Sequence, residues 1–199
     1  MVLTLLGLPL VYLVGALPVG YVVARVSGVD IRQHGSGNIG ATNVLRTLGR
    51  GPAAITLLLD VLKGYAAVWI ATALGREPWW GSVGALLAVT GNCWSVFLGF
   101  RGGKGMATGL GAFLRLMPLA VLPAMLVWVV VAVTFRYVSL ASLTAALCLP
   151  IGAVLLRYHP SAALAALAVG LIIVLRHREN VARLLAGTER KVGERVSVS

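Results

Sequence analysis

Six long apolar runs constrain the fold of this chain more than any other feature of its sequence. The runs lie near residues 3–24, 53–74, 80–98, 118–135, 138–156 and 160–176. Each has roughly the length that a helix needs to cross a lipid bilayer. Because lipid offers no hydrogen bonds to an exposed backbone, segments of this kind cross it as helices. With 59% hydrophobic and only 12% charged residues, the sequence predicts an all-α polytopic membrane protein and excludes a soluble domain.

A seventh apolar stretch, residues 104–116, is shorter and carries Arg115 near its end. We expect it to form a short helix that returns across part of the bilayer, and Pro118 to begin the next helix. The first apolar run lacks a preceding basic segment and continues to Arg25, which favours a retained span over a cleaved signal peptide. The sequence therefore predicts a single integral-membrane domain, residues 1–199, with seven transmembrane helices of which one is short.

The distribution of positive charge predicts the orientation. Thirteen of the 17 Lys and Arg residues lie in the loop at 25–51, in the loop at 99–104, at Arg136 and in the tail from Arg176 onward. With seven helices and the N-terminus outside, all thirteen face the cytoplasm, as the positive-inside rule requires. Six helices would place either the first loop or the tail on the wrong side. We therefore expect a cytoplasmic C-terminus.

Residues 101–108 form a glycine-rich, basic loop between two apolar segments. Glycines allow backbone N–H groups to converge on an oxyanion, and the Lys104 ammonium adds a positive charge beside them. The loop differs from the nucleotide-binding P-loop, because Gly105 follows Lys104 where that loop has a Ser or Thr hydroxyl for magnesium. We predict a phosphate site of another kind. The alternative is a tight turn whose basic residues face anionic lipid headgroups.

Two further segments carry groups that bind anions. Residues 35–46 combine glycines with hydroxyl and amide side chains and end in Arg46, whose planar guanidinium can bind two phosphate oxygens. His177 and Asn180, where the last span ends, are three residues apart and share one face of a helix. The simpler alternatives are a flexible connector and an interfacial helix start whose arginines reach headgroups. Together with Lys104, the two segments predict an anion site on one face.

Asp60 and Lys63 are three residues apart inside the second apolar run. Charges within a bilayer are costly, face inward and commonly pair with one another. We therefore expect a structural ion pair that supports the loops rather than a catalytic pair. Gly64, which follows, would allow a neighbouring helix to approach closely.

Several chemistries are excluded by what the sequence lacks. The histidines at 34, 159 and 177 are scattered among few carboxylates, so we expect no metal and no cofactor. No His is followed five positions later by Asp, which removes the His-x4-Asp signature of the common acyl-CoA-dependent glycerolipid acyltransferases. There is also no Gly-x-Ser-x-Gly elbow. The polar side chains that remain, from Ser, Asn, Arg, Lys and His, can bind phosphates but include few general bases.

The three polar segments together resemble those of the PlsY family, the integral-membrane, acyl-phosphate-dependent glycerol-3-phosphate acyltransferases of bacteria. The matching stretches are residues 35–43 with Arg46, residues 97–108 with their Phe-Arg-Gly-Gly-Lys-Gly core, and residues 176–180 with 183–184 and 187–189. They occur in the family's order and spacing, and the resemblance covers almost the whole chain.

The resemblance implies a seven-helix fold with a cytoplasmic active site in the bacterial inner membrane. It implies acyl transfer from acyl phosphate to the 1-hydroxyl of glycerol 3-phosphate, giving lysophosphatidic acid and phosphate, the first step of bacterial phospholipid synthesis. Its partners would be glycerol 3-phosphate, long-chain acyl phosphate, membrane lipid and the soluble enzyme that makes acyl phosphate, with no nucleic acid. The implied catalytic residues are Ser36, Arg46, Lys104, His177 and Asn180. The implied substrate-binding residues are Gly37, Asn38, Thr42, Asn43, Arg101, Gly102, Gly103, Gly105 and Thr108.

One position departs from the family pattern, which usually has His where this chain has Asn92. An amide forms hydrogen bonds as a neutral imidazole does, but it does not titrate near pH 7. We therefore interpret Asn92 as a hydrogen-bonding strut. For proton removal two routes stay open: the donor's own phosphate takes the hydroxyl proton, as the family resemblance implies, or His177 acts as the base.

Two functions of other classes fit the sequence less well. An anion transporter would place polar residues along its spans near the bilayer midplane and show repeated halves, whereas here only Asp60 and Lys63 are mid-span. A scaffold that binds anionic lipid through the net charge of +11 would not need three glycine- or amide-rich motifs. The sequence thus favours the acyltransferase.

Overall fold

The computed structural model describes residues 7–194, which form ten α-helices and two 3-10 helices and contain no strand. The part of the first predicted span before Gly7, and Arg195 of the tail, lie outside the described residues. In chain order the elements are α2 Leu8–Ala16, α3 Val19–Val26, η1 Ile31–Gln33, α4 Ala41–Leu48, α5 Arg50–Leu74, α6 Trp79–Cys93, η2 Val96–Leu98, α7 Met106–Leu116, α8 Pro118–Phe135, α9 Val138–Leu155, α10 Pro160–Arg176 and α11 Arg178–Leu185.

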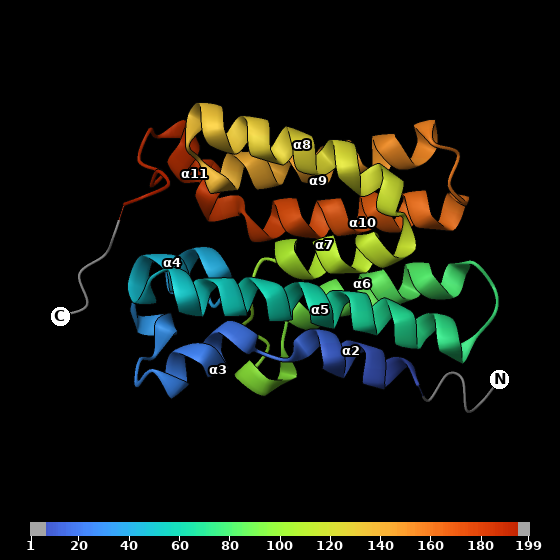
Figure 1. Cartoon of the computed structure of the whole chain (residues 1–199), viewed down its shortest axis with the longest axis horizontal. Coiled ribbons are helices and arrows are strands. Elements are labelled where there is room, and N and C mark those ends of the chain that lie inside the picture. The colour runs from blue at the N-terminus through green and yellow to red at the C-terminus, as the bar shows by residue number, and fades with distance from the viewer. Residues whose placement is uncertain (1–6, 195–199) are drawn as a thin grey trace.

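The long helices run side by side in two groups (Figure 1). On one side α9 packs against both α8 and α10, and on the other side α2, α5 and α6 pack together. The short helix α7 lies between the groups, where it contacts α5 and α6 as well as α8 and α10. α3, α4 and α11 all lie at the same end of the molecule, which brings the N-terminal third of the chain and its last helix to one side (Figure 1).

The helical membrane architecture predicted from the apolar runs is confirmed. Among the described residues, α5, α8, α9 and the stretch from α6 through η2 are long and apolar enough to cross a membrane. The number rises to six if each of the bent pairs α2–α3 and α10–α11 counts as one span. α7 is apolar but shorter, as expected. The count of seven and the orientation stay predictions.

The first predicted span is broken rather than continuous. α2 ends at Ala16, and α3 leaves it at an angle of 40°. Pro18 has no N–H to continue a helix and forces the preceding residue into an extended conformation, which Leu17 adopts with ψ 119. At the break the Leu17 carbonyl, which has no helical bond from Tyr21, accepts from the Lys63 ammonium at 2.7 Å and from the Val19 N–H at 3.0 Å. A buried cation thus satisfies a carbonyl that the break takes out of the helix.

The predicted ion pair within the second span is confirmed. Lys63 Nζ lies 2.7 Å from Asp60 Oδ1, and both side chains are almost completely buried. Lys63 also donates to the side-chain oxygen of Asn92 at 2.9 Å. One ammonium therefore joins α5 to the break between α2 and α3 and to the end of α6. This three-way link supports the loop that follows α6.

Glycines allow α5 and α7 to cross in backbone contact. A Cβ on Gly64 would overlap the carbonyl oxygen of Thr108, and a Cβ on Gly111 would overlap that of Val61. The close approach expected at Gly64 is thus confirmed. Small residues at such crossings are the usual basis of helix packing in lipid. The crossing holds the first turn of α7 at a fixed depth beside α5.

Candidate active site

A large cavity of about 1070 Å³ has its polar lining at the end of the molecule that carries α4 and α11. Its walls come from α4, α5, α7, α8, α9, α10 and α11, together with the loop before α4 and the segment after α11. Arg46, Lys104, His177, Asn180 and Arg183 line one part of it. The remainder is lined mainly by apolar side chains of α7, α8, α9 and α10. Such a space fits a molecule with an anionic head and a hydrocarbon tail.

The loop that carries Ser36 is organised by Asn43, a buried residue of α4. The Asn43 amide nitrogen donates to the backbone oxygens of Ile31, His34 and Asn38, at 3.3, 3.0 and 2.9 Å. Its Oδ1 accepts the backbone N–H of Ser36 at 2.9 Å. Both amide hydrogens are thus engaged, which differs from the expectation that Asn43 contacts a substrate. Its geometry indicates that Asn43 shapes the loop.

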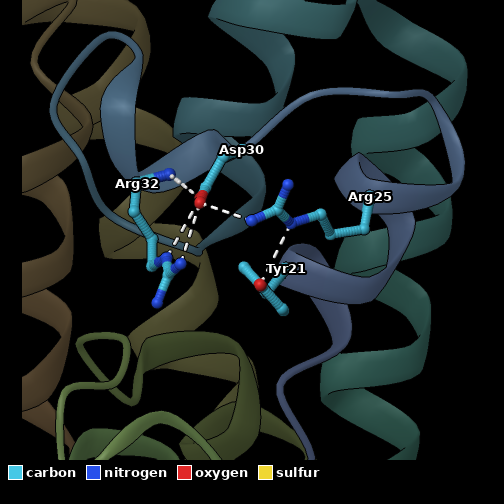
Figure 2. Close-up of polar contacts among 4 residues, drawn as sticks. All are labelled: Tyr21, Arg25, Asp30 and Arg32. Atoms are coloured by element: carbon cyan, nitrogen blue, oxygen red, sulfur yellow. Dashed lines mark hydrogen bonds and ion pairs between the residues drawn. The ribbon is translucent and has the colours of Figure 1, made fainter.

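A second cluster fixes the start of this loop, outside the cavity (Figure 2). Arg25 and Arg32 both form ion pairs with Asp30, at 2.7 and 2.8 Å, and both lie over the ring of Tyr21. Asp30 also caps η1 by accepting the backbone N–H of Arg32. These hydrogen bonds from Arg32, with the charge of Arg25, lower the pKa of Asp30 to about 2. The cluster ties the end of α3 to η1 and so positions the loop.

Lys104 is held by a chain of polar contacts that ends at Glu189. The Lys104 ammonium donates to Asn180 Oδ1, and Asn180 Nδ2 donates to Glu189 Oε1 at 2.6 Å. Glu189 also accepts from Ser139 Oγ and from Arg183 Nε, both at 2.7 Å. Burial alone would raise the pKa of Glu189, but these three hydrogen bonds outweigh it and hold the pKa below its usual value. Glu189 therefore stays ionised and orients both Asn180 and Arg183.

Burial raises the pKa of a carboxylate such as Glu189 but lowers the pKa of an ammonium such as Lys104. Removal from water, reinforced by the nearby charge of Arg183, lowers the pKa of Lys104 to about 8. The ammonium is therefore mostly charged at neutral pH, but it is poorly hydrated and short of negative partners. A bound anion would supply the partner that it lacks.

His177 lies at the junction of α10 and α11 and is buried. Its Nδ1 lies 2.8 Å from the carbonyl oxygen of Ile173, and since a carbonyl only accepts, Nδ1 carries the proton. Burial lowers the pKa of His177 to about 4, so the ring is neutral at physiological pH. Nε2 is then an acceptor, fixed in orientation by the bond that Nδ1 makes.

The glycine-rich loop is built differently from the cradle that the sequence predicts. The N–H of Gly102 donates to the carbonyl of Cys93 at 3.1 Å, and that of Gly103 donates to Asn92 at 2.9 Å. Arg176 in turn donates to the carbonyls of Gly102 and Gly103. These two amides are thus engaged within the protein and are not free for a phosphate. They fold the loop tightly onto the end of α6.

The first turn of α7 presents its own donors to the cavity. Gly105, with a φ of +81°, turns the chain into α7, and Gly105, Met106, Ala107 and Thr108 all line the cavity. The first N–H groups of a helix have no partner within it and carry a partial positive charge. Among the described residues, the buried Thr108 hydroxyl also lacks a hydrogen-bond partner. Beside Lys104, this turn offers the anion donors that Gly102 and Gly103 do not.

Residues 187–193, here called the C-terminal strap, cross the mouth of the cavity. Arg46 of α4 donates to the carbonyl of Arg190 at 3.3 Å. On the other side, Val192 N–H donates to the Arg136 carbonyl at 2.8 Å, and Arg136 donates back to the Val192 carbonyl at 3.1 Å. With Glu189 reaching inward, the strap joins α4, α11 and the α8–α9 turn around the site.

The structure brings together most of the residues that the sequence points to. The predicted site residues that line the cavity are Ser36, Asn38, Thr42, Asn43, Arg46, Gly103, Lys104, Gly105, Thr108, His177 and Asn180. Those that lie outside its lining are Gly37, Arg101 and Gly102. Arg101 is exposed to solvent, while the amides of the next two residues hold the loop against the end of α6. Its predicted contact with a substrate is not supported by this geometry.

Several polar residues that line the cavity lie outside the predicted site: Arg50, Asp60, Asn92, Arg136, Ser139, Ser142, Arg183 and Glu189. Arg183 is three residues after Asn180 and shares its helix face, a spacing that could have identified it. Within residues 7–194 no group of three or more His, Cys, Asp or Glu side chains is placed to hold a metal ion.

The fold and the site define a polytopic helical membrane protein whose cavity joins a cationic end to an apolar groove, the form expected for an enzyme that acts on an anionic lipid. A family model described as glycerol-3-phosphate acyltransferase matches residues 5–187. A glycerol-3-phosphate acyltransferase of Geobacter sulfurreducens is 48% identical over 90% of this chain and 93% of its own length. One of Rubrobacter xylanophilus is 47% identical over 97% and 95%.

Two solved structures are similar to almost the whole chain. A crystal structure of PlsY (YgiH), an integral membrane glycerol 3-phosphate acyltransferase in its glycerol 3-phosphate form, is 40% identical, with a TM-score of 0.91 over 96% of each chain. The lysophosphatidic acid form gives 39% and 0.89 over the same shares. The chain therefore belongs to the glycerol-3-phosphate acyltransferase family and is an integral-membrane acyltransferase of the PlsY type.

Proposed function

We propose that this chain transfers an acyl group from acyl phosphate to the 1-hydroxyl of glycerol 3-phosphate, giving lysophosphatidic acid and phosphate. The observation that carries the proposal is the cavity, in which Lys104, Arg46 and Arg183 line the same space as an apolar groove. Both substrates and the lipid product carry a phosphate, and two of the three also carry a hydrocarbon chain. Relatives named for glycerol 3-phosphate and solved with lysophosphatidic acid support this choice of acceptor and product.

The polar end of the cavity has donors for two phosphates. Arg46 and Arg183 offer planar guanidinium groups, and Lys104 offers a compact charge between Asn180 and the first turn of α7. Ser36 and Thr108 add hydroxyls on opposite walls. In the proposed complex the acceptor phosphate lies toward Ser36 and Arg46, and the donor phosphate lies at Lys104 and the α7 N-terminus. The acyl chain follows the groove.

The proton is better taken by the donor phosphate than by His177. A pKa of about 4 makes the His177 imidazole a weak base near pH 7, whereas the donor carries an anionic phosphate directly on its reacting carbon. In the proposed step the acceptor oxygen attacks the acyl carbon and its proton moves to a donor phosphate oxygen. The bond from the acyl carbon to the phosphate oxygen breaks with its electron pair on phosphate. His177 Nε2 accepts from the other hydroxyl of glycerol 3-phosphate and so orients the acceptor.

The charge distribution supports a site that faces the cytoplasm, in the inner membrane of a bacterium. That side holds the water-soluble acceptor and the soluble enzyme that would supply acyl phosphate. Acyl phosphate is a mixed anhydride with a good leaving group, so a site with few bases can still use it. A thioester donor presents no phosphate at its reacting carbon to the cations of the cavity.

The test is turnover by the purified full chain in liposomes, with glycerol 3-phosphate and one donor at a time in excess chelator. We expect lysophosphatidic acid from palmitoyl phosphate and none from palmitoyl-CoA or acyl carrier protein. Lys104→Ala should lower kcat/KM at least about a hundredfold, as loss of a preorganised charge does. Arg76→Ala, an exposed cation in the turn before α6, is the matched control and should keep full activity. Equal turnover with the thioester, or strict dependence on magnesium, would overturn the proposal.

A further inference from the structure

The apolar part of the cavity is open along one side, where exposed Leu57 of α5 and Val129 and Val133 of α8 line it, but its far end lies against the core. Its lining residues farthest along each helix from the polar end are Phe113 of α7, Val121 of α8, Leu149 of α9 and Ala166 of α10. Phe113, Val121 and Ala166 are buried members of the main hydrophobic core, and Leu149 packs against it. Ala146, one turn before Leu149, also lines the cavity and belongs to that core. A chain that runs straight along the helices from the polar end therefore meets these core side chains, here called the floor.

The depth of this floor follows from helix geometry. At a rise of about 1.5 Å per residue, Ala166 lies about 16 Å along α10 from His177. By the same measure Leu149 lies about 15 Å along α9 from Ser139, which hydrogen-bonds to Glu189. Two helices of opposite direction thus give the same depth. An extended hydrocarbon chain with C–C bonds of about 1.5 Å advances about 1.3 Å per carbon, so the groove accommodates about 12 carbons.

We propose that Ala146 and Leu149 set the length of acyl chain that this protein takes in an extended form, at about 12 carbons. The inference rests on the proposed function, since it places the acyl carbonyl at the polar end beside Lys104 and His177. It goes further in naming the residues of this chain that determine specificity among acyl donors. Longer chains must turn away from the floor.

The backbone at Ala146 cannot recede to make room. α9 and α10 cross there in close contact, because a Cβ on Gly170 would lie only 3.1 Å from the carbonyl oxygen of Ala146. A larger side chain at position 146 must therefore extend into the cavity and raise the floor. Leu149 is half-buried at the end of the same helix face, so truncating its side chain lowers the floor. The two positions predict opposite changes in chain-length preference.

The test is competition between acyl phosphates of different length in one liposome preparation of the full chain, with saturating glycerol 3-phosphate. We expect Ala146→Leu to lower the product ratio of 12-carbon over 8-carbon chains at least about tenfold, as mismatched methylenes in a pocket do. Leu149→Ala should raise the ratio of 16-carbon over 12-carbon chains several-fold. Ala73→Leu, the same substitution on the exposed face of α5, should change neither ratio. The KM for glycerol 3-phosphate should be unchanged throughout.

The outcomes separate the two proposals. If the unaltered protein turns over no acyl phosphate of any length, the proposed function fails. If it is active but both ratios stay within twofold in the two groove variants, the proposed function stands and the assignment of Ala146 and Leu149 is wrong. If Ala146→Leu does not fold, the ratio measured with Leu149→Ala decides alone. A fall in that ratio would also refute the assignment.

Discussion

Lys104 gives the most direct test of how the site binds phosphate. Because burial lowers its pKa to about 8, the ammonium is fully present well below pH 8 and is lost as the pH rises through that value. Substrate phosphates are already dianionic above about pH 7, so they add no titration on this side. We expect kcat/KM to fall about tenfold per pH unit above pH 8, reaching about one tenth of its plateau at pH 9. A bound anionic substrate should hold the proton on Lys104, so kcat at saturating substrate should begin to fall at a higher pH than kcat/KM does.

The decisive variant is Lys104→Arg, which keeps a cation that does not titrate below about pH 12. Its kcat/KM on the plateau should be lower than that of the unaltered protein, because a planar guanidinium replaces a compact ammonium between Asn180 and α7. The alkaline limb near pH 8 should disappear. Lys191→Arg changes an exposed lysine outside the cavity and should leave the limb in place. Initial rates in liposomes between pH 7 and about 10 measure both profiles. A limb that persists in Lys104→Arg, or a flat profile in the unaltered protein, would refute the assignment.

Three further predictions concern the architecture. Gly111→Ala places a Cβ against the Val61 carbonyl and should lower the free energy of unfolding by more than about 3 kcal/mol. Gly51→Ala, which has open space around it, is the control and should be neutral or slightly stabilising. Thermal unfolding in detergent measures both. Asn92→His should change kcat/KM at most several-fold and add no limb near pH 6.5, because Asn92 accepts from Lys63; a hundredfold gain with such a limb would show a proton carrier. In a background without native cysteines, cysteine at Gln33 should resist an impermeant thiol reagent in intact cells and cysteine at Glu77 should react; the reverse pattern would invert the topology.

The features that the sequence predicts well are those with a local cause. Asp60 and Lys63 meet because two charges three residues apart in an apolar helix have no better partners. Gly64 marks a helix crossing because a missing side chain has few other uses in lipid. The helices follow from the length of the apolar runs. In each case the neighbours in the sequence are enough to determine the outcome.

The features that it does not predict depend on contacts between distant segments. The sequence predicts that Asn43 is free to donate to a substrate, but in the structure its amide donates to backbone carbonyls of the loop before α4. The sequence predicts that the N–H groups of Gly102 and Gly103 bind phosphate, but in the structure they donate to backbone carbonyls at the end of α6. Glu189 enters the site only because the strap returns across the cavity. None of these partners can be read from spacing alone.

The strap also sets an order on the making of the protein. Arg46 and the backbone of Arg190 meet across 144 positions of sequence, and Glu189 reaches Asn180 only when α11 has been followed by its turn. A chain is synthesised from its N-terminus, so the strap is made after every helix that it joins. The hydrogen bonds from Asn180 and Arg183 to Glu189 are therefore among the last that the chain can form. We expect a chain that ends before the strap to keep its helices but to lack the carboxylate that orients both side chains.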